Sequence, residues 1–173
     1  DPLWSRGLGD VYKRQIELSD TLPDSPLAEM LESGLGAAFE EGEALDAVVA
    51  SSEAQVAALW KLREGISEAQ NHEGPSLKHD ISVPVSRIPA FITQADERLQ
   101  QAFPGVRIVC YGHVGDGNLH YNISKPLGSE DAPFKAQAEA IMHLIYDVTA
   151  AFAGSISAEH GIGQAKLEAA SRY

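Results

Sequence analysis

Apolar side chains recur every three or four residues in four stretches of the chain, a spacing typical of one buried face of an α-helix. The stretches are 26–39, a long run from Ser52, a run with Ile88, Phe91, Ile92, Ala95 and Leu99, and a run with Ile141, Leu144, Ile145, Val148 and Phe152. The segment 52–55, Ser-Glu-Ala-Gln, fits a capping box, in which serine and glutamine side chains accept hydrogen bonds from backbone N–H groups at the helix start. We therefore expect four helices, and a further helix at the C-terminal end.

Shorter runs rich in β-branched or alternating residues separate these helices and favour β-strands. They are 16–18, 44–50, 79–85, 106–113 and 118–124, with a brief run at 155–157 before a glycine-rich turn. Strands and helices alternate, and one hairpin is clear. The pattern predicts an α+β fold, with a mostly antiparallel sheet covered by helices on one face.

The hairpin lies within Tyr-Gly-His-Val-Gly-Asp-Gly-Asn-Leu-His-Tyr-Asn at 111–122. Glycines beside an aspartate between two alternating runs indicate a tight turn. With a loop at 114–117, His113 faces Asn118 and Tyr111 faces His120. Because side chains alternate along strands, one face of the hairpin is polar and the other apolar. The polar face carries Tyr111, His113, Asn118, His120 and Asn122, and the apolar face carries Ile108, Cys110, Leu119, Tyr121 and Ile123.

His113 and His120 are diagonal neighbours on this polar face, close enough for a common metal ion. The alternative is a surface hairpin whose histidines face water. A third ligand is available in the segment Ser-Ala-Glu-His-Gly-Ile-Gly at 157–163, which carries Glu159 and His160. Two imidazoles and one carboxylate leave an open position for a substrate, as a catalytic metal site requires. A phosphate cradle at the same glycines lacks the rest of a nucleotide-binding motif.

Two other histidines have simpler interpretations. His79 alternates with Ile81 and Val83, which favours a core position over a ligand role. His143 shares a polar helical face with Glu139 and Asp147, so we expect it to face solvent.

Composition narrows the classes of function. The net charge of -12 argues against a nucleic-acid partner. Cys110 is the single cysteine, so redox chemistry needs another carrier. Without a hydrophobic span or signal peptide, we expect a cytoplasmic protein, with peripheral membrane association left open. Residues 1–15 resemble a translated cloning adaptor, so we expect a non-native or unstructured segment there, a domain at 16–173, and a chain cut at both ends.

Gly-His-Val-Gly-Asp-Gly-Asn-Leu-His at 112–120 and Ser-Ile-Ser-Ala-Glu-His-Gly-Ile-Gly at 155–163 together resemble the C-terminal domain of the FAD-linked oxidase family. That family includes D-lactate, glycolate and D-2-hydroxyglutarate dehydrogenases. The resemblance extends upstream through Leu-Arg-Glu-Gly-Ile-Ser-Glu-Ala-Gln and Leu-Lys-His-Asp-Ile-Ser-Val-Pro-Val, so it covers 16–173. It implies a ferredoxin-like plait, and a missing flavin-binding domain of the same protein.

The resemblance also implies roles for individual residues. The metal ligands would be His113, His120 and Glu159. His160 would be the catalytic acid/base and would lie near the flavin, as would Asn118. The substrate would be held by Arg63, Ser67, Lys78 and Asn122; Ser67 stands where relatives often have threonine. The implied cofactors are FAD and a divalent metal, with zinc expected first and manganese or iron as alternatives.

This donor set suits the oxidation of a 2-hydroxy acid. A metal bound to the substrate's carboxylate and hydroxyl oxygens acidifies the hydroxyl, a neutral histidine takes the proton, and hydride leaves for the flavin. We expect oxidation of D-2-hydroxyglutarate, D-lactate or glycolate to the 2-oxo acid, with an electron acceptor that the sequence does not identify. Two alternatives stay open, a metal-dependent hydrolase and a non-catalytic α+β binding module.

Overall fold

The computed structural model describes residues 13–22, 24–162, 169 and 171–173. The expectation for 1–15 therefore lies largely outside the described residues, as does most of the expected last helix. The chain forms two compact units, Asp1–Ile66 and Ser67–Tyr173. Each unit is described by itself. No helix of the described residues is both long and apolar enough to cross a membrane.

The first unit contains two helices, α1 (Leu27–Glu40) and α2 (Glu53–Glu64). Ser52 caps α2, because its hydroxyl accepts a hydrogen bond from the Gln55 N–H at 3.3 Å. The Gln55 side chain returns to the Ser51 N–H at 2.7 Å, one residue earlier than a standard capping box would place it. Both predicted helices are confirmed.

The strands predicted at 16–18 and 44–50 are wrong, because both segments are irregular. A strand becomes stable only when a neighbour satisfies its backbone N–H and C=O groups. Neither segment pairs with a strand among the residues that the structure describes. Local composition favoured an extended chain at these two places, and tertiary context did not supply the partner.

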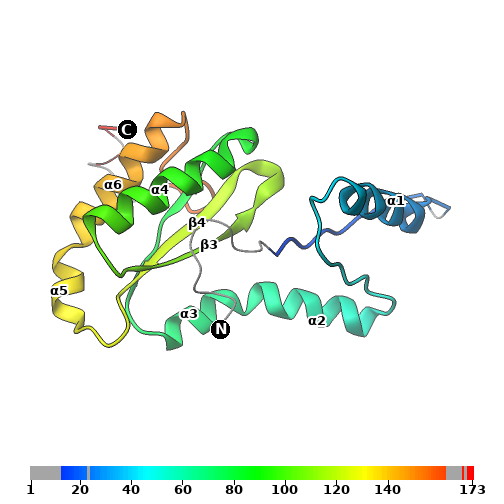
Figure 1. Ribbon diagram of the computed structural model, residues 1–173, viewed down its shortest axis with the longest axis horizontal. Helices are drawn as coiled ribbons and strands as arrows, with labels where there is room; N and C mark the ends of the chain where they lie inside the picture. The colour runs from blue at the N-terminus through cyan, green and yellow to red at the C-terminus, as the bar shows by residue number, and fades with distance from the viewer. Residues whose placement is uncertain (1–12, 23, 163–168, 170) are drawn as a thin grey trace. The chain divides into compact units, whose positions relative to one another are not determined.

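The second unit combines a four-stranded sheet with helices (Figure 1). In chain order its elements are α3 (Ile66–His72), β1 (Ser76–Leu77), β2 (Asp80–Ser82), η1 (Val85–Arg87), α4 (Ile88–Ala102), β3 (Arg107–His113), η2 (Val114–Asp116), β4 (Asn118–Ser124), α5 (Asp131–Ala136) and α6 (Ala138–Ala151). The strands expected at 106–113 and 118–124 and the helices expected around Phe91 and Ile145 are confirmed. The run 79–85 is a strand only over β2.

Strand β4 is the centre of the sheet, and all its neighbours run antiparallel to it. β3 pairs with the whole of β4 along one edge. On the other edge β1 and β2 pair with successive parts of β4, with Leu77 opposite Ile123 and Asp80 opposite His120. The N–H of Tyr121 donates to the His79 carbonyl at 2.9 Å, which joins the two short strands into one edge of the sheet.

The hydrophobic core lies between one face of this sheet and the helices α4 and α6, which lie side by side over β3 and β4 (Figure 1). It includes Phe91 and Leu99 of α4, Ile141 and Ile145 of α6, and Leu119, Tyr121 and Ile123 of β4. Phe91 packs edge-on against both Tyr121 and Phe152. The fold is therefore α+β, with an antiparallel sheet whose second face is left for polar side chains, as predicted.

Candidate metal and substrate site

The polar face of the sheet is ordered in rows by the strand register. Tyr111, His120 and Asp80 lie opposite one another across β3, β4 and β2, because directly paired residues of antiparallel strands point to the same face. His113, Asn118 and Ser82 form the next row. The predicted pairings of His113 with Asn118 and of Tyr111 with His120 are confirmed.

The turn that joins β3 to β4 depends on Gly117. This residue has φ +78°, a conformation that L side chains rarely adopt, and a Cβ atom there would overlap the carbonyl oxygen of Val83. The Val83 N–H donates to the Gly117 carbonyl at 3.0 Å, and the Asn118 N–H donates to the Asp116 carboxylate at 3.2 Å. These contacts fix the hairpin and with it the position of His113.

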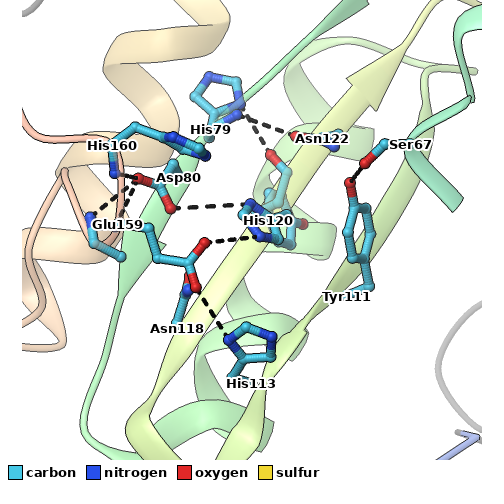
Figure 2. A network of polar contacts seen from close by, with 12 residues as sticks. Ser67, His79, Asp80, Tyr111, His113, Asn118, His120, Asn122, Glu159 and His160 are labelled. Atoms are coloured by element: carbon cyan, nitrogen blue, oxygen red, sulfur yellow. Dashed lines mark hydrogen bonds and ion pairs between the residues drawn. The ribbon is translucent and has the colours of Figure 1, made fainter. Parts of the chain in front are cut away.

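Glu159 brings the two hairpin histidines together (Figure 2). One carboxylate oxygen, Oε1, lies 3.0 Å from His113 Nδ1, and the other, Oε2, lies 3.6 Å from His120 Nε2. The side chains of His113 and Glu159 are 50% and 41% exposed, and that of His120 is 17% exposed. The three groups predicted as metal ligands therefore converge at a place open to solvent, where a small ligand has access.

Asp80 anchors the segment that carries Glu159 and His160. Its Oδ2 atom accepts hydrogen bonds from the backbone N–H groups of Ala158 at 3.3 Å, Glu159 at 3.0 Å and His160 at 2.9 Å. Burial raises the pKa of Asp80, but the three N–H donors outweigh it, so that the pKa is lowered from its ordinary value. The carboxylate is thus held in its charged form.

Asp80 also contributes to a second group of potential donors. Asp80, His120 and His160 each offer an atom within 4.8 Å of the others, and the rings of His120 and His160 lie 6.2 Å apart. Sequence reasoning missed Asp80. The signal was its place in the strand after Lys78, but only the pairing of β2 with β4, which joins distant parts of the chain, sets it opposite His120.

The predicted substrate residues are only partly gathered here. The Ser67 hydroxyl lies 2.7 Å from the Tyr111 hydroxyl, and the Tyr111 ring lies 5.0 Å from that of His120, so Ser67 is linked to the site. The Lys78 amine donates to the Asn71 side chain at 3.1 Å. Arg63 belongs to α2, in the unit that ends at Ile66.

Asn122, also predicted to hold substrate, is 2% exposed, and its side chain is engaged on both sides. Its amide oxygen accepts from the His79 N–H at 3.2 Å, and its amide nitrogen donates to Gln70 at 2.9 Å. In this arrangement Asn122 joins α3 to the sheet.

Asn118 contrasts with Asn122. It is 4% exposed, yet both polar atoms of its side chain have no hydrogen-bond partner among the described residues. A buried amide without partners costs free energy, so such a group calls for a partner such as ordered water, an ion or a ligand. The residue lies beside His113 in the hairpin (Figure 2). Its side chain therefore fits the predicted contact with a cofactor.

Two histidines and the single cysteine lie outside the group of proposed ligands. His79 is 3% exposed and its ring packs against Tyr146, so its core position is confirmed. The side chain of His143 is 32% exposed and lies 3.8 Å from Glu139, away from the site. Burial raises the pKa of the Cys110 thiol to about 12, helped by the charge of Asp96, which leaves this cysteine protonated and unreactive.

Comparison with known proteins decides the family. The chain matches the family model of the FAD linked oxidases, C-terminal domain, over residues 21–173. The chain belongs to this family. The resemblance seen in the two glycine-rich motifs is thereby confirmed.

Three similar proteins are each named as a D-2-hydroxyglutarate dehydrogenase. A D-2-hydroxyglutarate dehydrogenase of Xanthomonas citri pv. viticola is 44% identical over 142 residues, which are 80% of this chain and 30% of that protein. One of Stutzerimonas stutzeri is 43% identical over 75% of this chain and 28% of its own length. The mitochondrial D-2-hydroxyglutarate dehydrogenase of Danio rerio is 35% identical over 91% of this chain and 31% of its own length. The chain spans less than a third of each of these relatives.

Proposed function

We propose that this domain binds a divalent metal ion through His113, His120 and Glu159, and that it serves an FAD-dependent enzyme that oxidises a D-2-hydroxy acid to the 2-oxo acid. The observation that carries the proposal is the position of Glu159, whose two oxygens face an imidazole of each hairpin histidine. D-2-hydroxyglutarate is the first candidate substrate, because the relatives bear that name. D-lactate and glycolate are alternatives.

The donor set fits a metal of intermediate softness. Two imidazole nitrogens and a carboxylate suit zinc, and also manganese or iron, and leave coordination positions open. The bound ion would polarise the hydroxyl and carboxylate oxygens of the substrate and so favour loss of the hydroxyl proton. The partial exposure of His113 and Glu159 gives a substrate access to that open side.

The other predicted side chains would hold the substrate through charge or hydrogen bonds. Lys78 is a cation suited to a carboxylate, and a dicarboxylate such as 2-hydroxyglutarate offers two of them. Arg63 stays a prediction from the resemblance. The Ser67 hydroxyl contacts the Tyr111 hydroxyl, and the Tyr111 ring in turn lies beside the His120 ring. Asn122 would contribute through the α3 contact that it maintains with Gln70, or through its amide once substrate is present.

His160 is the proposed proton acceptor. Its backbone N–H is fixed by Asp80 and its ring faces that of His120, so the imidazole is held next to the proposed metal ligands (Figure 2). A neutral imidazole can take the hydroxyl proton as the C–H bond breaks. The flavin, when bound, would supply the hydride acceptor for that carbon. Asn118 and His160 are the residues that would contact it.

A flavin-binding domain is the partner that this proposal requires, with a downstream electron acceptor not identified by the chain. The test replaces the matching segment of the Xanthomonas citri relative with this chain and measures dye reduction with D- and L-2-hydroxyglutarate, D-lactate and glycolate. We expect flavin-dependent oxidation of a D-2-hydroxy acid, lost on metal chelation and restored by zinc or manganese. A folded, flavin-loaded chimera that oxidises none of these acids would contradict the proposal.

A further inference from the structure

We propose that Asp80 is a positioning residue, which holds the Glu159-His160 segment and the His120 ring in the geometry of the metal site. The inference rests on the proposed function for its purpose and on contacts among the described residues for its geometry. Asp80 is 7% exposed, and buried carboxylates persist only where donors or charges compensate the loss of water. Its surroundings supply hydrogen-bond donors to Oδ2 and place the imidazole of His120 near Oδ1.

The first oxygen, Oδ2, holds the backbone of the segment. Three consecutive N–H groups, those of Ala158, Glu159 and His160, converge on it within 2.9 to 3.3 Å. Glu159 and His160 are otherwise exposed, and Gly161 follows with φ +67°. One buried carboxylate thus aligns a proposed metal ligand and the proposed proton acceptor in a single set of charge-assisted hydrogen bonds.

The second oxygen, Oδ1, faces the ring of His120. His120 Nδ1 lies 3.9 Å from Oδ1, a charge contact longer than a hydrogen bond, while Nε2 of the same ring lies 3.6 Å from Glu159. One nitrogen therefore faces the proposed metal position and the other faces Asp80. A carboxylate behind a metal-bound histidine fixes its tautomer and ring orientation, and its loss commonly lowers metal affinity about 10- to 100-fold.

A direct ligand role for Asp80 is the competing interpretation, since Asp80, His120 and His160 form a compact donor group. Two observations favour positioning. Oδ2 already accepts three N–H donors, and Glu159 is the carboxylate that faces both His113 and His120. A ligand role is an outcome that the experiment below distinguishes.

The first arm of the test needs no metal. Amide hydrogen exchange by NMR is measured on the metal-free chain, on its Asp80→Ala and Asp80→Asn variants, and on an Asp131→Ala control. Asp131 lies away from the site, and its carboxylate pairs with the Lys125 amine at 2.7 Å. We expect exchange at 158–160 to quicken at least about tenfold in Asp80→Ala and to stay unchanged in the control. Unchanged exchange at 158–160 in a folded Asp80→Ala variant would overturn the proposal.

The second arm measures metal affinity by competition with a zinc chelator. Asp80→Asn keeps an acceptor for the backbone N–H groups but places an amide where Oδ1 faces His120, so we expect affinity to fall about 10- to 100-fold. The visible spectrum of the Co²⁺-loaded Asp80→Asn variant should show bands at the same positions as that of the Co²⁺-loaded unmodified chain. Affinity equal to that of the unmodified chain, or displaced Co²⁺ bands, would overturn the positioning role.

The two arms separate this inference from the proposed function. An unmodified chain that binds no zinc would contradict the metal site, while exchange at 158–160 would still decide whether Asp80 holds the segment. If Asp80→Ala does not fold, Asp80→Asn decides through its zinc affinity.

Discussion

Glu159 Oε1 lies 3.0 Å from Nδ1 of His113, although the two residues come from separate glycine-rich motifs. The contact places the end of the β3–β4 hairpin against the segment that Asp80 anchors. The other oxygen of the same carboxylate, Oε2, lies 3.6 Å from Nε2 of His120, so two imidazoles and one carboxylate lie within reach of a common metal ion. The geometry thus suits a site whose ligands are gathered before the ion binds.

We expect the hairpin turn to tolerate alanine at Gly115 but not at Gly117. Gly117→Ala forces an unfavourable φ and a clash with Val83, so we expect a loss of about 1–3 kcal/mol in the free energy of unfolding. Gly115→Ala meets no atom within 4 Å and should change stability little. Urea unfolding of both variants checks the difference; equal stabilities would show that the turn does not depend on Gly117.

The core contact between α4 and the sheet should dominate stability. Phe91 is fully buried against Tyr121 and Phe152, so Phe91→Ala leaves a cavity and should cost about 3–5 kcal/mol. Leu127→Ala is the matched control, because Leu127 is 67% exposed. Chemical denaturation followed by tryptophan fluorescence or circular dichroism measures both, and a similar loss in the two variants would contradict the assigned core.

Asp96 should make stability depend on pH in the direction opposite to most carboxylates. Burial raises its pKa above 3.8, although the hydroxyl of Tyr121 donates to it and lowers the pKa in part. The fold therefore binds this proton more tightly than the unfolded chain does. The resulting stabilisation is complete below about pH 3.8 and is lost as the pH rises through the folded pKa.

Asp96→Asn removes this titration. The free energy of unfolding of the native chain, minus that of the variant, should become more negative as pH rises from about 4 to 7. Denaturation at several pH values measures the difference, in which the titration of other groups cancels. A difference that stays constant, or that grows in the native chain's favour, would refute the raised pKa.

His160 should act in proton transfer and not in holding the metal. In the flavin-containing chimera, His160→Gln should lower kcat about 100- to 10,000-fold and leave the metal content unchanged. His143→Gln, remote from the site, should leave both unchanged. Loss of the metal together with activity in His160→Gln would instead place His160 among the ligands.

Local patterns predicted much of the fold. The register of β3 and β4 followed from the sequence because a short turn joins the strands, so that one glycine-rich segment sets which residues face each other. The stripe of Ile88, Phe91, Ala95 and Leu99 likewise predicted the buried face of α4. The convergence of His113, His120 and Glu159 was expected from the resemblance, and the geometry agrees with it.

Contacts between distant segments were beyond local reasoning. Asp80 stands next to a residue that was expected to bind substrate, yet nothing nearby in sequence shows that β2 pairs with β4 or that 158–160 folds onto its carboxylate. The same limit explains the wrong strands at 16–18 and 44–50, where extended propensity met no pairing partner among the described residues. Asn122 was expected at the substrate, and its engagement with Gln70 depends on where α3 packs.

The metal content of the chain tests the central claim most directly. Elemental analysis after dialysis compares the unmodified chain with the His113→Ala/His120→Ala double variant, with Glu159→Ala, and with His143→Ala as the control. We predict about one zinc, manganese or iron ion per unmodified chain and per His143→Ala chain, and none in the other two variants. Equal metal content in all four proteins, or none in a folded unmodified chain supplied with these ions, would contradict the assignment of His113, His120 and Glu159.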